Sequence, residues 1–476
     1  MRMAQPGQGE VQDDVAEDGL APPRRYFAWA TVILGVTLAV LDGTIANVAL
    51  PTIAQDFQAD ASVSIWIVNG YQLAIVMALL PLATLGEKIG YRRIYLWGIA
   101  LFTVASVGCV MSTSLTSLTT ARIVQGLGAA GLMSVNTAVL RYIVPQSRFG
   151  AALGFNALAV AAAATAGPAI AGFALAVLSW QWLFAINIPL GILTVALGWR
   201  SLPESDRSGR RFDSFAAVMS AVSIGLVITT IDSLGHDLPW YLVLLQAVAC
   251  VVGFALLIRH ERRVDRPMLP LDLFRIPIFS LSVAASISAF TAQILAFVSL
   301  PFAFQVAMGF PPAQVGLLMM PWPLALAVVA PLAGRLSDSR SPALLGTGGM
   351  VLLAVGLLLL GLLPADPGFW NIAWRMVLCG IGFGLFQTPN NRTMIGSAPK
   401  PRSGAASGVL GTARLTGQSI GAALVALLLA QLGIGGATWS LFLGAGFAAL
   451  AGVLSILRVD HWQPPHPQAA GSSALR

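Results

Sequence analysis

The chain has 476 residues, of which 57% are hydrophobic and only 10% are charged. Soluble proteins carry about 25% charged residues. This composition, with a mean hydropathy of +0.79, therefore excludes a soluble globular protein. Because a membrane-spanning helix needs roughly 20 apolar residues, the length allows a dozen or more spans. The sequence predicts an all-α polytopic membrane protein.

The formal charge of +7 does not indicate a nucleic-acid partner. The basic residues stand in short clusters between apolar runs, which is how membrane proteins set their orientation. The three cysteines (Cys109, Cys250 and Cys379) lie inside apolar runs, and no cysteine or histidine spacing suits a metal. We therefore expect no metal, no cofactor and no catalytic residue.

Residues 1–25 are polar and lack the apolar core of a signal peptide, so we expect a disordered cytoplasmic tail. Fourteen apolar runs follow, and each is long enough to span a bilayer. They lie at about 27–50, 62–85, 94–112, 118–140, 150–178, 182–199, 214–231, 240–258, 277–300, 314–334, 343–363, 371–391, 405–431 and 438–457.

The basic residues orient these spans. Three arginines fall inside spans (Arg122, Arg375 and Arg414), and the other 24 of the 27 Lys and Arg residues (27 − 3) lie on one side if the N-terminus is inside. The loops on the other side contain neither Lys nor Arg. By the positive-inside rule, we expect both termini to be cytoplasmic.

An internal duplication is predicted from two similar stretches, 81–87 and 331–338, at an offset of 251 residues (338 − 87). Arg122 and Arg375 are 253 residues apart (375 − 122), which agrees. The predicted architecture is six, two and six spans. It comprises an N-terminal bundle, 26–200, an extra pair with its linkers, 201–276, a C-terminal bundle, 277–458, and a second cytoplasmic tail, 459–476.

Five stretches resemble motifs of one transporter family. They are L-D-G-T-I-A-N-V-A-L-P at 41–51, G-E-K-I-G-Y-R-R at 86–93, R-I-V-Q-G at 122–126, G-P-A-I-A-G at 167–172 and W-Q-W-L-F-A-I-N-I-P-L-G at 180–191. Together they identify the chain, from about residue 27 to 457, as similar to the fourteen-span drug:proton antiporter-2 family of the major facilitator superfamily.

The resemblance implies a major facilitator fold and two functional elements. The first is a cytoplasmic gate that pairs charges when the inner side is shut; its residues are Glu87, Gly90, Arg92, Arg93 and, as a weaker counterpart, Asp338. The second is an antiporter motif in span five; its residues are Gly167, Pro168 and Gly172. The alternatives are that the loop charges only orient the protein, and that the glycines only allow close helix packing.

Asp42 is the only carboxylate well inside a span. Ionisable groups are costly in hydrocarbon and are functional candidates by default. Arg122 lies at a similar depth, so the two can pair, and we expect them to couple transport to protons. A cationic substrate that competes with the proton for Asp42 would make exchange obligatory. The alternative for Arg122 is that it only bonds helices together through backbone carbonyls.

Aromatic, amide and arginine side chains on several spans are expected to line a substrate cavity at mid-depth. Such a lining suits a permissive site for amphipathic molecules, although each residue could instead serve helix packing. The residues are Trp66, Asn69, Tyr71, Gln72, Asn156, Gln293, Phe386, Gln387, Asn390 and Arg414.

These features predict a proton-coupled exporter of amphipathic, often cationic small molecules in a bacterial inner membrane, with two bundles that rock about a central cavity. Its partners would be substrate, protons and the lipid bilayer. We expect a monomer, and nothing indicates a periplasmic adaptor. A dedicated exporter of one metabolite or lipid is the alternative. A membrane-embedded transferase would need a long outside loop, and the longest here has about twelve residues.

Overall fold

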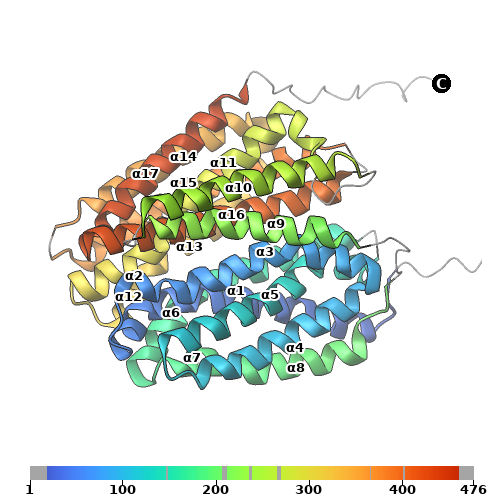
Figure 1. Cartoon of the computed structure of the whole chain (residues 1–476), viewed down its shortest axis with the longest axis horizontal. Coiled ribbons are helices and arrows are strands. Elements are labelled where there is room, and N and C mark those ends of the chain that lie inside the picture. The colour runs from blue at the N-terminus through green and yellow to red at the C-terminus, as the bar shows by residue number, and fades with distance from the viewer. Residues whose placement is uncertain are drawn as a thin grey trace, which may run out of the picture.

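The computed structural model describes residues 19–145, 148–205, 212–234, 238–264, 270–364, 366–399 and 402–459. Within these ranges, fourteen helical segments are long and apolar enough to cross a membrane, which confirms the predicted number. Twelve of them form two bundles of six, and the other two lie at the side of the bundles (Figure 1). Of the predicted tails, residues 1–18 and 460–476 lie outside the described residues.

The N-terminal bundle holds the first six spans. Two of these are broken, because the short α2 and α7 lead directly into α3 and α8. The helices are α1 (Arg24–Asp56), α2 (Ala61–Ser64), α3 (Trp66–Ile89), α4 (Tyr91–Val110), α5 (Leu115–Ile143), α6 (Phe149–Val177), α7 (Gln181–Ala185) and α8 (Asn187–Ser201).

Helix α1 is longer than the predicted span because it continues through Pro51 to Asp56. A proline removes one backbone hydrogen bond, and the helix extends beyond that defect. Its buried residues include Leu50, Ala54 and Pro51 itself.

The C-terminal bundle holds the last six spans, and its first helix ends in a π-helical turn, η3. The elements are the 3-10 turn η2 (Leu273–Arg275), α11 (Pro277–Phe302), η3 (Ala303–Ala307), α12 (Pro312–Met319), α13 (Pro321–Ser339), α14 (Pro342–Gly361), α15 (Phe369–Gly396), α16 (Ser403–Leu432) and α17 (Gly435–Ile456).

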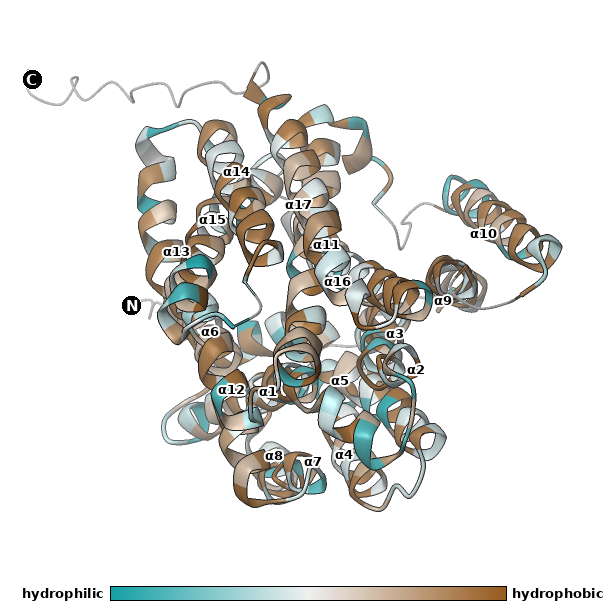
Figure 2. Ribbon diagram, turned by 90° about the vertical axis from the view of Figure 1, so that its left-hand side faces the viewer, coloured by the Kyte–Doolittle hydropathy of each residue, from teal (hydrophilic) through white to brown (hydrophobic). Residues whose placement is uncertain are grey.

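The two extra spans, α9 (Ser214–Ser233) and α10 (Trp240–Glu261), lie at the side of the bundles. Helix α9 contacts α3 and α16, whereas α10 packs mainly on α9 and projects from the rest of the molecule (Figure 2). Large apolar side chains on α10, such as Trp240 and Val251, are exposed. A large exposed apolar surface marks contact with a membrane or another protein, and on a helix long enough to span a bilayer it suits contact with lipid.

The two ends of the molecule differ in charge. We call the end that holds the loops around 90, 145, 205, 270, 340 and 400 the basic end, because the Lys and Arg residues of the loops gather there. The opposite end is the far end. The largest buried cluster joins the bundles toward the far end, where Leu50 and Ile53 of α1 belong to one core with Phe302 and Val315.

The predicted repeat is visible in helix packing. A Cβ on Gly126 of α5 would lie 2.4 Å from Tyr71 O of α3. In the C-terminal bundle, a Cβ on Gly380 of α15 would lie 2.3 Å from Trp322 O of α13. The offsets are 251 (322 − 71) and 254 (380 − 126). Equivalent helices therefore cross at equivalent glycines, because only glycine allows this approach.

This helix crossing also shows which residue of the second repeat is equivalent to Arg122. The sequence analysis matched Arg122 with Arg375, and the structure corrects that match. At an offset of 254, the equivalent residue is Met376 (122 + 254), which is fully buried. Arg375 instead bonds to Asn371 on its own helix and stacks on Trp374, with its guanidinium carbon 4.8 Å from the ring centre. The two arginines are therefore not equivalent, because three extra residues shift the register of α15.

Candidate functional site

Asp42 and Arg122 form a buried ion pair between α1 and α5, with Arg122 Nη1 bonded to Asp42 Oδ2. The exposed fraction is 2% for Asp42 and zero for Arg122. The sequence placed the two residues at similar depth, and the structure brings them together. Removing one partner of such a buried pair costs about 3–5 kcal/mol, so the two charges depend on each other.

The second oxygen of Asp42 accepts two amide hydrogen bonds. Asn187 Nδ2 of α8 donates to Oδ1 over 2.6 Å, and Gln125 Nε2 of α5 donates over 3.1 Å. Gln125 Nε2 also lies 2.9 Å from Ser106 Oγ of α4. Three spans of the N-terminal bundle, α1, α5 and α8, therefore meet at one carboxylate, and α4 is connected to it through Gln125.

Arg122 has partners that do not depend on Asp42. Its Nε donates to Ile67 O over 3.1 Å, and its Nη1 also donates to Gln125 Oε1 over 2.5 Å. The guanidinium carbon lies 4.1 Å from the ring centre of Tyr71 and 5.3 Å from that of Phe184. Cation–π contacts of this kind contribute about 0.5–2 kcal/mol each. Arg122 is therefore held by several contacts in addition to its ion pair with Asp42.

Burial changes one expectation about substrate. Because Asp42 is almost fully buried, a substrate cannot reach its carboxylate in this conformation. Direct competition between a cationic substrate and the proton would require the helices around Asp42 to separate first.

Arg122 Nη2 has no hydrogen-bond partner among the described residues. One hydrogen-bond donor of the Asp42–Arg122 pair is therefore still unused.

The predicted antiporter motif lies on α6 of the N-terminal bundle and contacts both α1 and the C-terminal bundle. On one side, a Cβ on Gly167 of α6 would lie 2.0 Å from Thr44 Oγ1 of α1. On the other side, Gly172 faces Gly316 of α12, where a Cβ on Gly316 would lie 2.5 Å from Pro168 O. Helix α6 therefore contacts α1 two residues after Asp42, and it also forms part of the boundary with the C-terminal bundle.

Gln305 adds a polar contact between the bundles near the far end. It lies in the π-helical turn η3, a rare geometry that is frequent at functional sites. Its Nε2 donates to Val48 O over 2.8 Å, and its Oε1 accepts from Thr52 Oγ1 over 3.2 Å. The bundles are therefore held together near this end by both close packing and hydrogen bonds.

The residues of the predicted gate lie at the basic end. Gly90 joins α3 to α4 with a positive φ of 105°, which favours glycine. Arg92 has partners in or close in sequence to the N-terminal bundle: its Nη2 donates to Trp199 O over 2.5 Å, and its Nη1 lies 3.6 Å from Glu204 Oε1 in an ion pair. Arg93 is exposed and Glu87 is half-buried. Asp338 belongs to α13, and its side chain lies outside the described part of the protein.

Several amides predicted to line the cavity have unused polar atoms. Neither side-chain atom of Asn69 has a hydrogen-bond partner among the described residues, and the same holds for Gln72 Oε1 and Asn156 Oδ1. Buried polar atoms are normally bonded, so these amides have capacity for water or a ligand. Asn69 and Gln72 are one helical turn apart and share a face of α3.

Other predicted cavity residues serve packing. Tyr71 covers Arg122 and donates to Ala39 O over 3.1 Å. Phe386 is fully buried near Gly346. Asn390 Oδ1 accepts from Arg458 Nη1 over 2.5 Å at the basic end of the C-terminal bundle. Tyr71, Phe386 and Asn390 are therefore buried in the packed interior in this conformation.

The remaining cavity residues are partly exposed. They are Trp66, Gln293, Gln387 and Arg414. The Nε atom of Arg414 has no hydrogen-bond partner among the described residues. Two cavities are lined by other residues: one lies between α3, α4, α5 and α9, and the other lies at the far end.

The sequence analysis did not select Gln125 and Asn187 as site residues, although both lie within the motifs it quoted. Gln125 is three residues after Arg122, so the two share a face of α5. That spacing could have indicated a role for Gln125. Asn187 had no such signal, because its contact with Asp42 depends on how α8 packs against α1.

The sequence matches the Major Facilitator Superfamily over residues 32–422. The chain belongs to this superfamily. Its fold agrees: a POT family transporter, solved in complex with a thioalcohol-conjugated peptide, superimposes with a TM-score of 0.70 at 16% identity, covering 91% of this chain and 96% of that one.

Named relatives include several transporters. "Uncharacterized transporter YebQ" of Escherichia coli (strain K12) is 51% identical over 94% of this chain and 98% of its own. "Riboflavin transporter RibZ" of Clostridioides difficile is 29% identical, with coverages of 86% and 89%. "Multidrug resistance protein Stp" of Mycobacterium tuberculosis is 32% identical, with coverages of 83% and 74%. This protein is therefore a transporter rather than an enzyme. The resemblance to drug exporters predicted from its motifs is confirmed.

Proposed function

We propose that this transporter is a proton-coupled antiporter that exports amphipathic, often cationic small molecules by alternating access. The observation that supports this most is the buried pair of Asp42 and Arg122, with the amides of Asn187 and Gln125 on the same carboxylate. A purely structural polar contact would not need a titratable group in hydrocarbon.

Protonation of Asp42 would remove the negative charge from this cluster. The ion pair with Arg122 would be lost, while the bonds of Arg122 to Ile67 O and Gln125 Oε1 and its aromatic contacts would remain. The proton would therefore weaken the attachment of α1 to α5 and α8 without displacing the arginine. Such a change in helix attachment is what a coupling site requires.

Helix α6 offers a physical connection from this cluster to the contact between bundles. Thr44 follows Asp42 by two residues and packs against Gly167, and Gly172 on the same helix packs against Gly316 of the other bundle. A shift of α1 on protonation would move the helix that closes the far end. In this proposal the proton and the substrate act on one equilibrium between two conformations.

The substrate class is proposed from the partly exposed aromatic and amide groups, Trp66, Gln293 and Gln387, and from the unused amide atoms of Asn69 and Gln72. Similarity to a multidrug resistance protein supports a broad range of substrates. Similarity to a riboflavin transporter favours the second candidate, a transporter dedicated to one metabolite.

We place the basic end in the cytoplasm of a bacterial cell, by the positive-inside rule. Glu87, Gly90, Arg92 and Arg93, with Asp338 of the other bundle, would then form a gate that pairs charges when the inner side closes. The contacts of Arg92 with Trp199 O and Glu204 would exchange for contacts with the other bundle in that state. The protein is proposed to act as a monomer.

A transport panel tests the proposal. Purified protein in liposomes is given cationic, neutral and anionic amphipathic compounds, and riboflavin, with and without a pH gradient. Accumulation of several unrelated cations that requires the gradient supports a multidrug antiporter. Accumulation of a single metabolite supports the second candidate. Transport at the same rate without the gradient would contradict proton coupling.

A further inference from the structure

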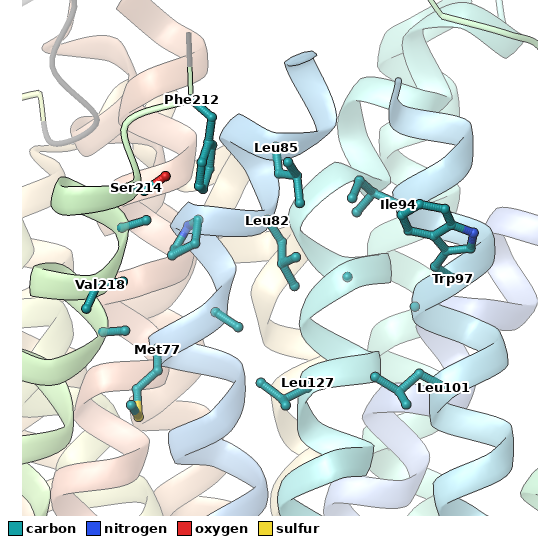
Figure 3. Close-up of a pocket in the computed structure, with 16 residues that line it drawn as sticks. Met77, Leu82, Leu85, Ile94, Trp97, Leu101, Leu127, Phe212, Ser214 and Val218 are labelled. Carbon is teal, nitrogen blue, oxygen red and sulfur yellow. The ribbon is translucent and has the colours of Figure 1, made fainter. Parts of the chain in front are cut away.

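A groove runs along the outside of the N-terminal bundle, next to the extra helix α9. It has a volume of about 580 Å³ and lies in the half of the helices nearest the basic end. Helix α3 forms its floor with Leu82 and Leu85. One wall is formed by Val218 of α9 and by Phe212, which precedes this helix, and α4 and α5 form the other wall (Figure 3).

On the far-end side of the groove, α9 packs on α3. There Leu73 of α3 packs with Ile228 of α9, and a Cβ on Gly225 would lie 3.3 Å from Met77 Cε. Toward the basic end, the groove-lining residues of α9 include the small Ala217 and Ala221. Small side chains on one wall leave the space above α3 open.

Water is a poor occupant of this space. A buried water needs two to four polar partners, and the only polar side-chain atoms in the lining are the Ser214 hydroxyl and the Trp97 indole nitrogen. Trp97 is 63% exposed and Val218 is 59% exposed, so the groove opens toward the surrounding bilayer. Hydrocarbon is therefore the occupant that fits its walls.

Positive charge stands at the end of the groove. Lys88 follows the lining residue Leu85 by three positions, and Arg93 precedes the lining residue Trp97 by four. Each pair shares a helix face. Both cations are exposed and have no ion-pair partner among the described residues. If the acyl chain of a lipid occupied the groove, the headgroup of that lipid would lie near these two cations. Their positive charge complements a negatively charged headgroup.

We propose that this groove binds one acyl chain of an anionic phospholipid, from the leaflet at the basic end, with the headgroup between Lys88 and Arg93. The lipid would fill the space between α9 and the N-terminal bundle and so attach the extra pair of helices. The inference does not depend on which substrate is transported, although Arg93 also belongs to the proposed cytoplasmic gate.

Photo-cross-linking of the wild-type protein tests the site. The protein is reconstituted with a phosphatidylglycerol that has a photoreactive group on its acyl chain, and labelled peptides are mapped by mass spectrometry. We expect labels in 77–85 and 214–221. Labels confined to other lipid-facing helices would overturn the proposal. Loss of these labels when a transported cation is added would assign the groove to substrate and would also overturn it.

Native mass spectrometry with variants tests the chemistry of binding. Ala221→Phe fills the groove and should lower the retained phosphatidylglycerol roughly tenfold, since each excluded methylene loses its burial. Ala255→Phe, at an exposed alanine of α10 outside the groove, is the matched control and should retain lipid. Equal retention by both would contradict the site.

The headgroup contact is tested by Lys88→Gln combined with Arg93→Gln. In equimolar phosphatidylglycerol and phosphatidylcholine, we expect this variant to lose the preference for phosphatidylglycerol while it still retains a lipid. An unchanged preference would overturn the role of the two cations.

Discussion

Asn187 Nδ2 donates a hydrogen bond of 2.6 Å to Asp42 Oδ1, which ties the sixth span to the carboxylate of the first. Both residues are buried. Helices α1 and α8 are therefore joined at the same group that pairs with Arg122 of α5. A change of charge on Asp42 would act on all three helices at once.

Asn187→Ala should slow proton-driven transport roughly 10- to 100-fold, because a hydrogen bond to a charged group contributes about 1.5–3 kcal/mol and 1.4 kcal/mol is a factor of ten. The measurement is the initial rate of uptake into liposomes across a pH gradient. Asn136→Ala is the control, since Asn136 is also buried in this bundle and its Oδ1 has no partner among the described residues. Equal rates in the two variants would contradict the role of Asn187.

Gly316→Val should favour separation of the bundles at the far end. A Cβ on Gly316 would lie 2.5 Å from Pro168 O and 2.9 Å from Gly172 Cα, so either α6 or α12 must move. Spin labels at the exposed positions Thr113 and Trp370 should show longer distances. Gly446→Val is the control, because no atom lies within 4 Å of a Cβ there. An unchanged distance distribution in Gly316→Val would show that this contact does not hold the conformation.

Gln305→Leu should also lengthen the distance between these two labels, because it removes both hydrogen bonds to α1. Each bond contributes about 0.5–1.5 kcal/mol, so the open population should rise several-fold. Thr52→Val removes one of the two bonds and should have a smaller effect. In the Gln305→Leu background Thr52→Val should add nothing; a full additional effect would mean that Thr52 acts through another partner.

The orientation is tested by labelling with a membrane-impermeant thiol reagent. In a protein whose three cysteines are replaced, a cysteine at Thr113 should be labelled from outside intact cells. A cysteine at Lys88 should react only after the cells are permeabilised. Both positions are exposed, so access to the reagent depends on the side of the membrane. The reverse pattern would place the basic end outside.

Composition and apolar run length were sufficient to predict the fourteen spans, because hydrocarbon imposes length and apolarity on each one. They did not predict where spans break, as between α2 and α3. The sequence analysis also assumed that the two repeats are separated by the same number of residues throughout. Three extra residues before the crossing point of α15 change this separation, so that Met376 rather than Arg375 is equivalent to Arg122.

The centre of the site was predictable for a different reason. Charged groups inside spans are so few that Asp42 and Arg122 could be selected by position alone. Polar uncharged residues are common in spans, and the sequence does not say which face of a helix they occupy. Asn187 was therefore missed, and Phe386 and Asn390 were expected in a cavity although they are packed inside the C-terminal bundle.

The most direct test of the central claim is the pH-gradient-driven transport of the Asp42→Asn protein in liposomes. We expect uphill transport to be abolished, because the variant cannot exchange a proton at the carboxylate that joins α1, α5 and α8. Asp42→Glu should retain part of the rate, and Asp56→Asn, which changes an exposed carboxylate bonded to Trp180 at the far end, should retain most of it. Uphill transport by Asp42→Asn at near the wild-type rate would contradict proton coupling at Asp42.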